Sequence, residues 1–200
     1  MIHCAVNITM DYSAFSHGQI HSKLWLCEHL EPYLPTNSKI LILASWYNVL
    51  AMMLIMRKPK GYTSIVGIEK NEESIKVANR ICDAWMINND QIVKNEKASI
   101  EDYNYWDFDQ FDAIINTSVE DIQSNRWYHQ VPRGKLIALQ SNNLTPEKVS
   151  QYKDWIIQDP NPDMETFKEK YHMDELLFEG SKEFDYITLK YDRYMLIGRK

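Results

Sequence analysis

Residues 39–48 read KILILASWYN, and residues 63–71 read TSIVGIEKN. In each stretch a short apolar run predicts a buried strand, and small or polar residues follow where the strand would end. The residues Asn48–Met56 are rich in helix formers and predict a helix after the first strand. Asn71 is expected to cap a second helix that reaches Ile87. The repeated order of strand, turn and helix predicts a parallel α/β sheet.

The first of these stretches, together with the helix expected after it, could also be taken for a membrane span. Ile40 to Met56 carries no charge and is 17 residues long, close to the lower limit of about 17–25 residues for crossing a bilayer. Its middle, however, is interrupted by the polar residues of Ser45–Asn48. We therefore interpret the stretch as a strand and a helix buried inside a soluble protein.

The same alternation continues outward along the chain. A helix is expected from a Ser16 cap to about Leu34. The last two expected strands have no clear helix between them, which favours an antiparallel hairpin. The predicted fold is therefore a three-layer α/β sandwich, with a mostly parallel sheet and an antiparallel C-terminal edge hairpin. The further strands are expected at residues 111–116, 135–140, 175–178 and 194–197.

The composition excludes several classes of protein. The chain has 200 residues, of which 44% are hydrophobic and 25% are charged, as in a globular protein of about one domain. Its net charge is −6, whereas a protein that coats nucleic acid needs clustered Lys and Arg to neutralise phosphates. Three cysteines without a CxxC pair predict neither a disulfide framework nor a zinc site. With no secretory leader at Met1–Cys4, the expected location is the cytoplasm.

Polar and acidic residues follow four of the expected strands, at 44–47, 69–71, 116–120 and 140–143. Ligands of parallel α/β sheets bind outside the carboxyl ends of the strands, so these segments are expected to form one binding rim. Glu69 is the most informative residue, because a carboxylate about 20 residues beyond the first turn commonly accepts hydrogen bonds from ribose hydroxyls. A solvated glutamate, favoured by the positive end of the next helix, is the alternative.

The first turn of this rim contains no glycine. Ala44-Ser45-Trp46-Tyr47-Asn48 stands where dinucleotide-binding folds carry G-x-G-x-x-G, whose glycines let the backbone approach a pyrophosphate. This difference argues against NAD and FAD as ligands. A ligand without a pyrophosphate, such as S-adenosylmethionine, is easier to reconcile with the turn.

Five segments carry a family resemblance by their order and spacing. They are ILILASWYN (40–48), SIVGIEKN (64–71), KASIEDY (97–103), FDAIINTSVEDI (111–122) and GKLIALQSNN (134–143). Together they resemble the class I S-adenosylmethionine-dependent methyltransferases, which have a Rossmann-like fold. The resemblance covers roughly residues 39–143, and YMLIGRK at 194–200 is similar to the closing strand of that family. More narrowly, FSHGQIHSKLWL at 15–26 with SWYN, NTSVEDI and LQSNN resembles small phage-encoded methyltransferase-like proteins, which would place the chain in the host cytoplasm.

The resemblance implies a layout for the whole chain and roles for the residues of the rim. A single domain over residues 1–200 would comprise a helical cap segment (1–38), a cofactor-binding core (39–143) and a C-terminal part (144–200). Glu69 would bind the ribose of S-adenosylmethionine, and Asn116 would touch its methionine amino group or the substrate. The residues expected at the cofactor are Ala44, Ser45, Trp46, Tyr47, Glu69, Lys70, Ser99, Ile100 and Asn116, with Ser99 and Ile100 facing the adenine.

The methyl acceptor is less constrained than the cofactor. Asn-Thr-Ser-Val at 116–119 departs from the Asp-Pro-Pro-Tyr pattern of DNA amino-methyltransferases, so the resemblance implies a small molecule or a protein side chain as acceptor. By the same resemblance, the segment that holds Gln19 and Lys23 could close over the cofactor. Ser141 and Asn142 could hydrogen-bond a polar substrate, although Ser and Asn are also common in turns.

A base helps if the acceptor must lose a proton. Glu120, Asp121, His17 and His21 are the candidates for this base, with a helix-capping carboxylate as the favoured interpretation of Asp121, and Asn116 is a further candidate catalytic residue. Glu120 has an alternative as an exposed residue of a capping box, Ser118–Asp121, that opens a short helix. His17 with His21 has an alternative as an ordinary polar helix face. Two histidines at this spacing also suit a metal, but the sequence shows no third ligand, so no metal is predicted.

Partners other than the substrate are weakly specified. The acidic and aromatic residues 101–110 are interpreted as a surface loop, with a cradle for a cation as the alternative. A homodimer is compatible with the sequence, and no membrane contact is predicted. Two rivals to methyl transfer stay open: an enzyme that transfers the aminocarboxypropyl group or breaks the cofactor down, and a non-catalytic protein that binds a partner through its aromatic surface.

Overall fold

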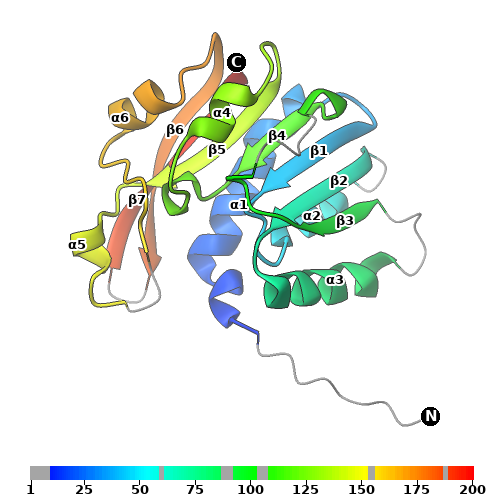
Figure 1. The fold of residues 1–200 in the computed structure, drawn as a ribbon, viewed down its shortest axis with the longest axis horizontal. Coiled ribbons are helices and arrows are strands. Elements are labelled where there is room, and N and C mark those ends of the chain that lie inside the picture. Colours follow the sequence, from blue (N-terminus) through cyan, green and yellow to red (C-terminus); the bar gives the residue numbers. More distant parts are fainter. Residues whose placement is uncertain (1–9, 59–60, 87–91, 103–107, 153–155, 187–188) are drawn as a thin grey trace.

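The computed structural model describes residues 10–58, 61–86, 92–102, 108–152, 156–186 and 189–200. Within these residues, seven strands form one sheet, drawn in Figure 1. The strands are β1 (Ser38–Leu43), β2 (Tyr62–Glu69), β3 (Val93–Lys97), β4 (Ala113–Asn116), β5 (Leu136–Asn142), β6 (Glu175–Tyr186) and β7 (Leu189–Arg199). Their order is β3-β2-β1-β4-β5-β7-β6. The pairs from β3 to β5 are parallel, and β7 is antiparallel to both its neighbours, which confirms the predicted sheet.

Two of the helices begin where the sequence predicts caps. The Ser16 side chain accepts a hydrogen bond from the Gln19 amide at the start of the first helix, and the Asn71 side chain accepts from the Glu73 and Ser74 amides at the start of the third. The helices are α1 (His17–Leu30), α2 (Val49–Arg57), α3 (Glu72–Met86), α4 (Arg126–Gln130), α5 (Pro146–Val149) and α6 (Met164–Lys170).

Both faces of the sheet are covered, as the uninterrupted apolar run of β1 requires. Successive side chains of a strand point to opposite faces. Ile40 and Ile42 accordingly pack into a core with residues of α1, α2 and α3. Leu41 and Leu43 pack into a second core with residues of α4 and α6. The result is the predicted three-layer, Rossmann-like arrangement.

The last strands are much longer than the sequence predicts. β6 has 12 residues and β7 has 11, against the short strands expected at 175–178 and 194–197. Exposed charged side chains of the hairpin, such as Lys182 and Glu183, interrupt its apolar pattern and conceal its length. β5 likewise extends through Asn142, where a turn was expected, because β7 pairs with it along its whole length.

The segment after β4 also differs from the prediction. Val119–Asp121 is a single 3₁₀ turn, and the Ser118 side chain makes no capping hydrogen bond. The Asn116 side chain takes that part instead, since its Oδ1 accepts from the Ser118 amide at 3.0 Å. The predicted capping box is therefore wrong, because the amide side chain at the end of β4 already turns the chain.

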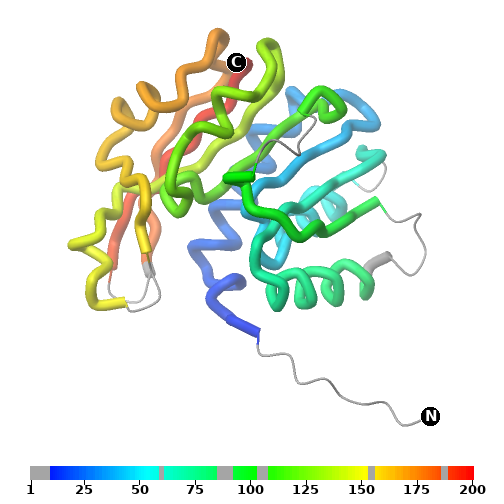
Figure 2. The backbone as a smooth tube through the Cα atoms, in the orientation of Figure 1, coloured from blue at the N-terminus to red at the C-terminus, as the bar shows by residue number. Residues whose placement is uncertain are grey.

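The first helix and the last hairpin meet in space, although they stand far apart in the sequence. α1 contacts both β6 and β7, and Figure 2 shows this helix, in blue, between the hairpin and the other end of the sheet. No helix in the described ranges is both long enough and apolar enough to cross a membrane. Cys27 and Cys82 are buried and free. Residues 103–107 of the acidic aromatic segment lie outside the described residues.

Candidate functional site

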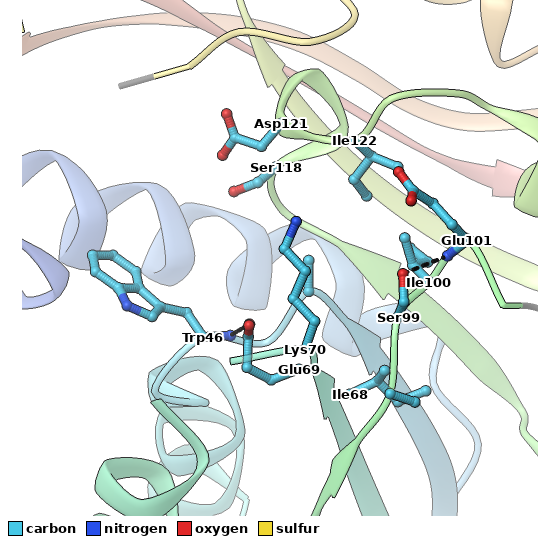
Figure 3. A pocket seen from close by; sticks show the side chains of 12 residues that line it. Trp46, Ile68, Glu69, Lys70, Ser99, Ile100, Glu101, Ser118, Asp121 and Ile122 are labelled. Carbon is cyan, nitrogen blue, oxygen red and sulfur yellow. Dashed lines mark hydrogen bonds between the residues drawn. The ribbon is translucent and has the colours of Figure 1, made fainter. Parts of the chain in front are cut away.

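A pocket of about 240 Å³ opens at the carboxyl ends of β1, β2 and β4. Its wall is built from the loop after β1, the end of β2, the segment after β3 and the turn after β4, as seen in Figure 3. Three of the four predicted rim segments therefore contribute to it, whereas 140–143 does not line it. The lining residues are Ala44, Trp46, Ile68, Glu69, Lys70, Ala98, Ser99, Ile100, Glu101, Ser118, Asp121 and Ile122.

The loop after β1 has the backbone of a glycine turn without its glycines. Ala44, Trp46 and Asn48 have φ values of 48°, 49° and 50°, in the left-handed region that favours glycine. The loop is tied to β2, because the Ser45 amide donates to the Ile68 carbonyl at 2.8 Å. Sequence reasoning treated the missing glycines as a departure at this turn, but the backbone makes the tight turn regardless.

The left-handed Ala44 gives a prediction about stability. A left-handed alanine costs roughly 1–2 kcal/mol, whereas glycine adopts this conformation freely and only loses somewhat more chain entropy on folding. We expect Ala44→Gly to raise the free energy of unfolding by up to about 1 kcal/mol, as measured by urea denaturation. Ala113→Gly, within the extended strand β4, is the control and is expected to lower it. A loss of stability in Ala44→Gly would contradict the strain inferred here.

Glu69 lies at the edge of the sheet, where the sequence predicts it. It is half-buried at the end of β2 and lines the pocket. Its Oε2 accepts from the Trp46 amide at 3.0 Å, and its Oε1 accepts from the Asn71 amide at 2.8 Å (Figure 3 shows the Trp46 bond). An ionised carboxylate has about four acceptor positions. Glu69 can therefore fix the loop after β1 and still accept hydrogen bonds from a ligand.

One side of the pocket is suited to a flat apolar ring. Ile68, Ile100 and Ile122 present aliphatic side chains there. Ser99 and Glu101 add polar atoms at the edge, and the Ser99 hydroxyl already accepts from the Glu101 amide at 3.2 Å. Ser99 and Ile100 are thus at the pocket, as predicted. Ile68 and Ile122 were missed, because their apolar side chains look like ordinary core residues in the sequence.

Charge distinguishes the kind of ligand that this pocket suits. Three carboxylates line it, from Glu69, Glu101 and Asp121, against one ammonium group from Lys70. The excess of negative charge disfavours a phosphate-rich ligand and favours a cationic one. Lys70 was predicted at the site, whereas Asp121 was interpreted as a capping residue.

Three predicted cofactor contacts are buried beside the pocket and do not line it. Ser45 and Tyr47 pack beneath the loop after β1, where the Tyr47 hydroxyl accepts from the Asp11 amide at 2.9 Å. Asn116 is fully buried at the end of β4. Alternate residues of a tight loop point in opposite directions, so Ala44 and Trp46 face the pocket while their neighbours support it. His17 lies on the exposed surface of α1, stacked on His21 at 4.0 Å, which agrees with the ordinary helix face.

Glu120 is buried, which excludes the exposed position that was the alternative to a role at the site. Its Oε1 accepts a hydrogen bond from Asn142 Nδ2 and lies 3.8 Å from Nη1 of Arg193. Burial raises the pKa of Glu120 well above its usual range, because desolvation penalises the carboxylate more than the Arg193 charge favours it. Glu120 does not line the described pocket. The geometry therefore does not support direct contact between Glu120 and a cofactor bound there.

Further buried polar side chains surround Glu120. Lys23 donates a hydrogen bond to Gln19 within α1, and Gln140 donates to the Ser22 carbonyl at 2.9 Å. Ser141 accepts from Asn161 at 2.8 Å. Of the substrate residues predicted from the sequence, Lys23, Ser141 and Asn142 are therefore buried inside the protein, whereas Gln19 is only partly buried. We call Lys23, Thr117, Glu120, Gln140, Asn142 and Arg193 the inner cluster.

No group of three or more metal-ligating side chains occurs among the residues with described positions. Comparison of the sequence with protein-family models finds no match, and no curated protein is detectably similar in sequence. The comparison of folds, in contrast, finds clear similarity.

Three solved structures illustrate this similarity. A candidate sarcosine dimethylglycine methyltransferase from Galdieria sulphuraria matches with a TM-score of 0.69 and 13% identity, over 91% of this chain and 86% of that one. Geranyl diphosphate C-methyltransferase from Streptomyces coelicolor was solved in complex with Mg²⁺, geranyl diphosphate and S-adenosyl-L-homocysteine. It matches with a TM-score of 0.64 and 11% identity, over 90% of this chain and 78% of that one. The YcgJ protein from Bacillus subtilis matches with a TM-score of 0.65 and 11% identity, over 90% of this chain and 99% of that one. The chain thus shares its fold, nearly end to end, with solved structures of which the first two are described as methyltransferases.

Proposed function

We propose that the chain binds S-adenosylmethionine in the described pocket and transfers its methyl group to a small molecule or a protein side chain. The observation that carries this proposal is the position of Glu69, at the end of β2 in the pocket wall. The fold supports it, since the Streptomyces neighbour is in complex with S-adenosyl-L-homocysteine. The phage connection and the homodimer stay predictions.

The residues present fit this cofactor. Glu69 would accept hydrogen bonds from the ribose hydroxyls, and the adenine would lie beside Ile100, between Ile68 and Ile122. The negatively charged wall would favour the positive sulfonium centre. When bound, the cofactor supplies a methyl group activated by that sulfonium. The chain then needs to hold the acceptor in line, and positioning of this kind can supply about 7–11 kcal/mol of a barrier.

A calorimetric titration tests the proposal most directly. We expect S-adenosylmethionine and S-adenosylhomocysteine to bind with one site per chain. ATP serves as the control ligand, and we expect it to bind far more weakly, because the acidic pocket repels its phosphates. If neither adenosyl ligand gave heat or a thermal shift at millimolar concentration, the chain would be a partner-binding protein on the same fold.

Analysis of the products separates the catalytic alternatives. Methyl transfer leaves S-adenosylhomocysteine. Aminocarboxypropyl transfer leaves methylthioadenosine instead. Incubation with S-adenosylmethionine and a mixture of candidate acceptors, followed by mass spectrometry, is expected to show S-adenosylhomocysteine.

A further inference from the structure

The inner cluster lies directly behind the wall of the pocket. The turn after β4 borders both, since Ser118 and Asp121 line the pocket while Thr117 and Glu120 belong to the cluster. α1 contributes Lys23, β5 contributes Gln140 and Asn142, and β7 contributes Arg193. Side chains from four parts of the chain thus converge at the carboxyl ends of the central strands.

The hydrogen bonds of the inner cluster leave several atoms unused. Arg193 Nη2 donates to the Thr117 carbonyl at 2.6 Å, but Arg193 Nε is buried with no partner among the described residues. Glu120 Oε2 and Gln140 Oε1 are likewise buried and unpartnered within the described ranges. Buried polar atoms are nearly always hydrogen-bonded, because leaving one unpaired is costly. Three such atoms among the residues of the cluster indicate that another molecule completes it.

The charges indicate what kind of molecule it is. The cluster contains two cations, Lys23 and Arg193, and one carboxylate, Glu120. Arg193 is paired with Glu120, while Lys23 has a hydrogen bond to the neutral side chain of Gln19. Burying an ammonium group without an anionic partner is costly. An anionic ligand would neutralise Lys23 and take up the unused donor of Arg193.

We propose that the inner cluster is the site for the methyl acceptor, and that the acceptor carries a carboxylate held by Lys23 and the Nε side of Arg193. This inference rests on the proposed function. Two planar oxygens suit the fixed donor geometry of a guanidinium group. Glu120 Oε2 and Gln140 Oε1 would then accept from an N–H or O–H group elsewhere on the same molecule.

The ionisation of Lys23 agrees with this assignment. Burial, together with the nearby charge of Arg193, lowers the pKa of Lys23 to about 7. A bound carboxylate would raise it again, so binding takes up a proton above neutral pH. Cys27, which also faces Lys23, does not titrate in this range, because burial raises the pKa of its thiol to about 12. Glu120, which faces Arg193 and Asp121, adds to the same pH dependence of carboxylate affinity. Its protonation at lower pH removes a negative charge that competes with the bound carboxylate.

The test uses the full chain saturated with S-adenosylhomocysteine. Formate, acetate, glycinate and benzoate are titrated calorimetrically, with the amide of each as the matched control. We expect at least one carboxylate to bind and its amide not to bind. The affinity should rise at least tenfold as the pH falls from above to below 7, and titrations in buffers of different ionisation enthalpy should show proton uptake above pH 7.

Variants locate the binding. Lys23→Met keeps the length of the side chain, and we expect it to weaken carboxylate binding at least tenfold and to abolish proton uptake by Lys23, with the affinity for S-adenosylhomocysteine unchanged. Lys190→Met, at an exposed lysine paired with Glu183, is the control and should change neither affinity. Glu120→Gln keeps an acceptor for Asn142, and carboxylate affinity should not fall.

Two results would overturn the assignment: no carboxylate binding to the loaded protein, or equal binding to Lys23→Met. Failure of S-adenosylhomocysteine itself to bind would instead reject the proposed function. The two failures are therefore separable.

Discussion

Glu69→Ala is expected to weaken the binding of S-adenosylmethionine more than tenfold, equivalent to about 1.4 kcal/mol or more. The ribose hydroxyls would lose a charged acceptor, and charge-assisted hydrogen bonds are roughly twice as strong as neutral ones. The Trp46 amide, which donates to Glu69 at 3.0 Å, would also lose its partner, so the loop after β1 would be held less firmly. Both effects lower affinity. Calorimetric titration of the purified variant measures their sum.

Glu73→Ala is the matched control. Glu73 lies in the first turn of α3, close to Glu69 in the sequence, but its carboxylate pairs with Lys76 on the surface and does not line the pocket. We expect its affinity for the cofactor to equal that of the unchanged chain. Glu69→Gln separates charge from shape, and we expect it to fall between the two. Unchanged affinity in Glu69→Ala would place the cofactor elsewhere and remove the main support for the proposed function.

Gly67→Ala is expected to damage both stability and cofactor binding. A Cβ at Gly67 would lie 2.3 Å from Asn48 Nδ2 and 2.9 Å from Ser45 Oγ, so the loop after β1 would have to move. Asn48 has little freedom to yield, because it is fully buried and donates to Asn95 Oδ1 at 2.8 Å. Overpacking of this kind costs about 1–3 kcal/mol. Thermal denaturation should show a fall in Tm of several degrees, and the affinity for S-adenosylmethionine should fall with it.

A second substitution tests the cause of this effect. Asn48→Gly removes the obstructing side chain at a position whose φ of 50° suits glycine. If the contact between residues 48 and 67 is responsible, the double variant should be more stable than the sum of the two single changes predicts. Strict additivity would mean that Gly67→Ala acts in another way.

The fold could be predicted because its signals are local. The run of β1, buried on both faces, and the caps Ser16 and Asn71 need only neighbouring residues to be recognised. The length of the β6–β7 hairpin could not be predicted, since many side chains of β6 face solvent and break the apolar pattern. The end of β5 was missed for a related reason: Ser141 and Asn142 are turn formers by preference, and only the pairing with β7 keeps them extended.

The site was predicted only in part, because some of its residues are marked by local signals and others depend on distant parts of the chain. Glu69 follows an apolar strand directly, so its place at the sheet edge could be read from the sequence. Glu120 could not be placed, because its burial depends on Asn142 and Arg193, which are distant in the chain. Arg193 was missed entirely, since it stands beside Asp192 in a partly charged stretch of β7 and resembles an exposed edge residue.

The inner cluster joins Lys23, near the beginning of the chain, to Arg193, near residue 200. During synthesis on the ribosome, α1 emerges early and the partner strand emerges late. The sheet from β1 to β5 can begin to assemble before β7 exists, but Glu120 lacks its guanidinium neighbour until the hairpin folds back between β5 and solvent. Acceptor recognition would therefore be the last property that the nascent polypeptide acquires.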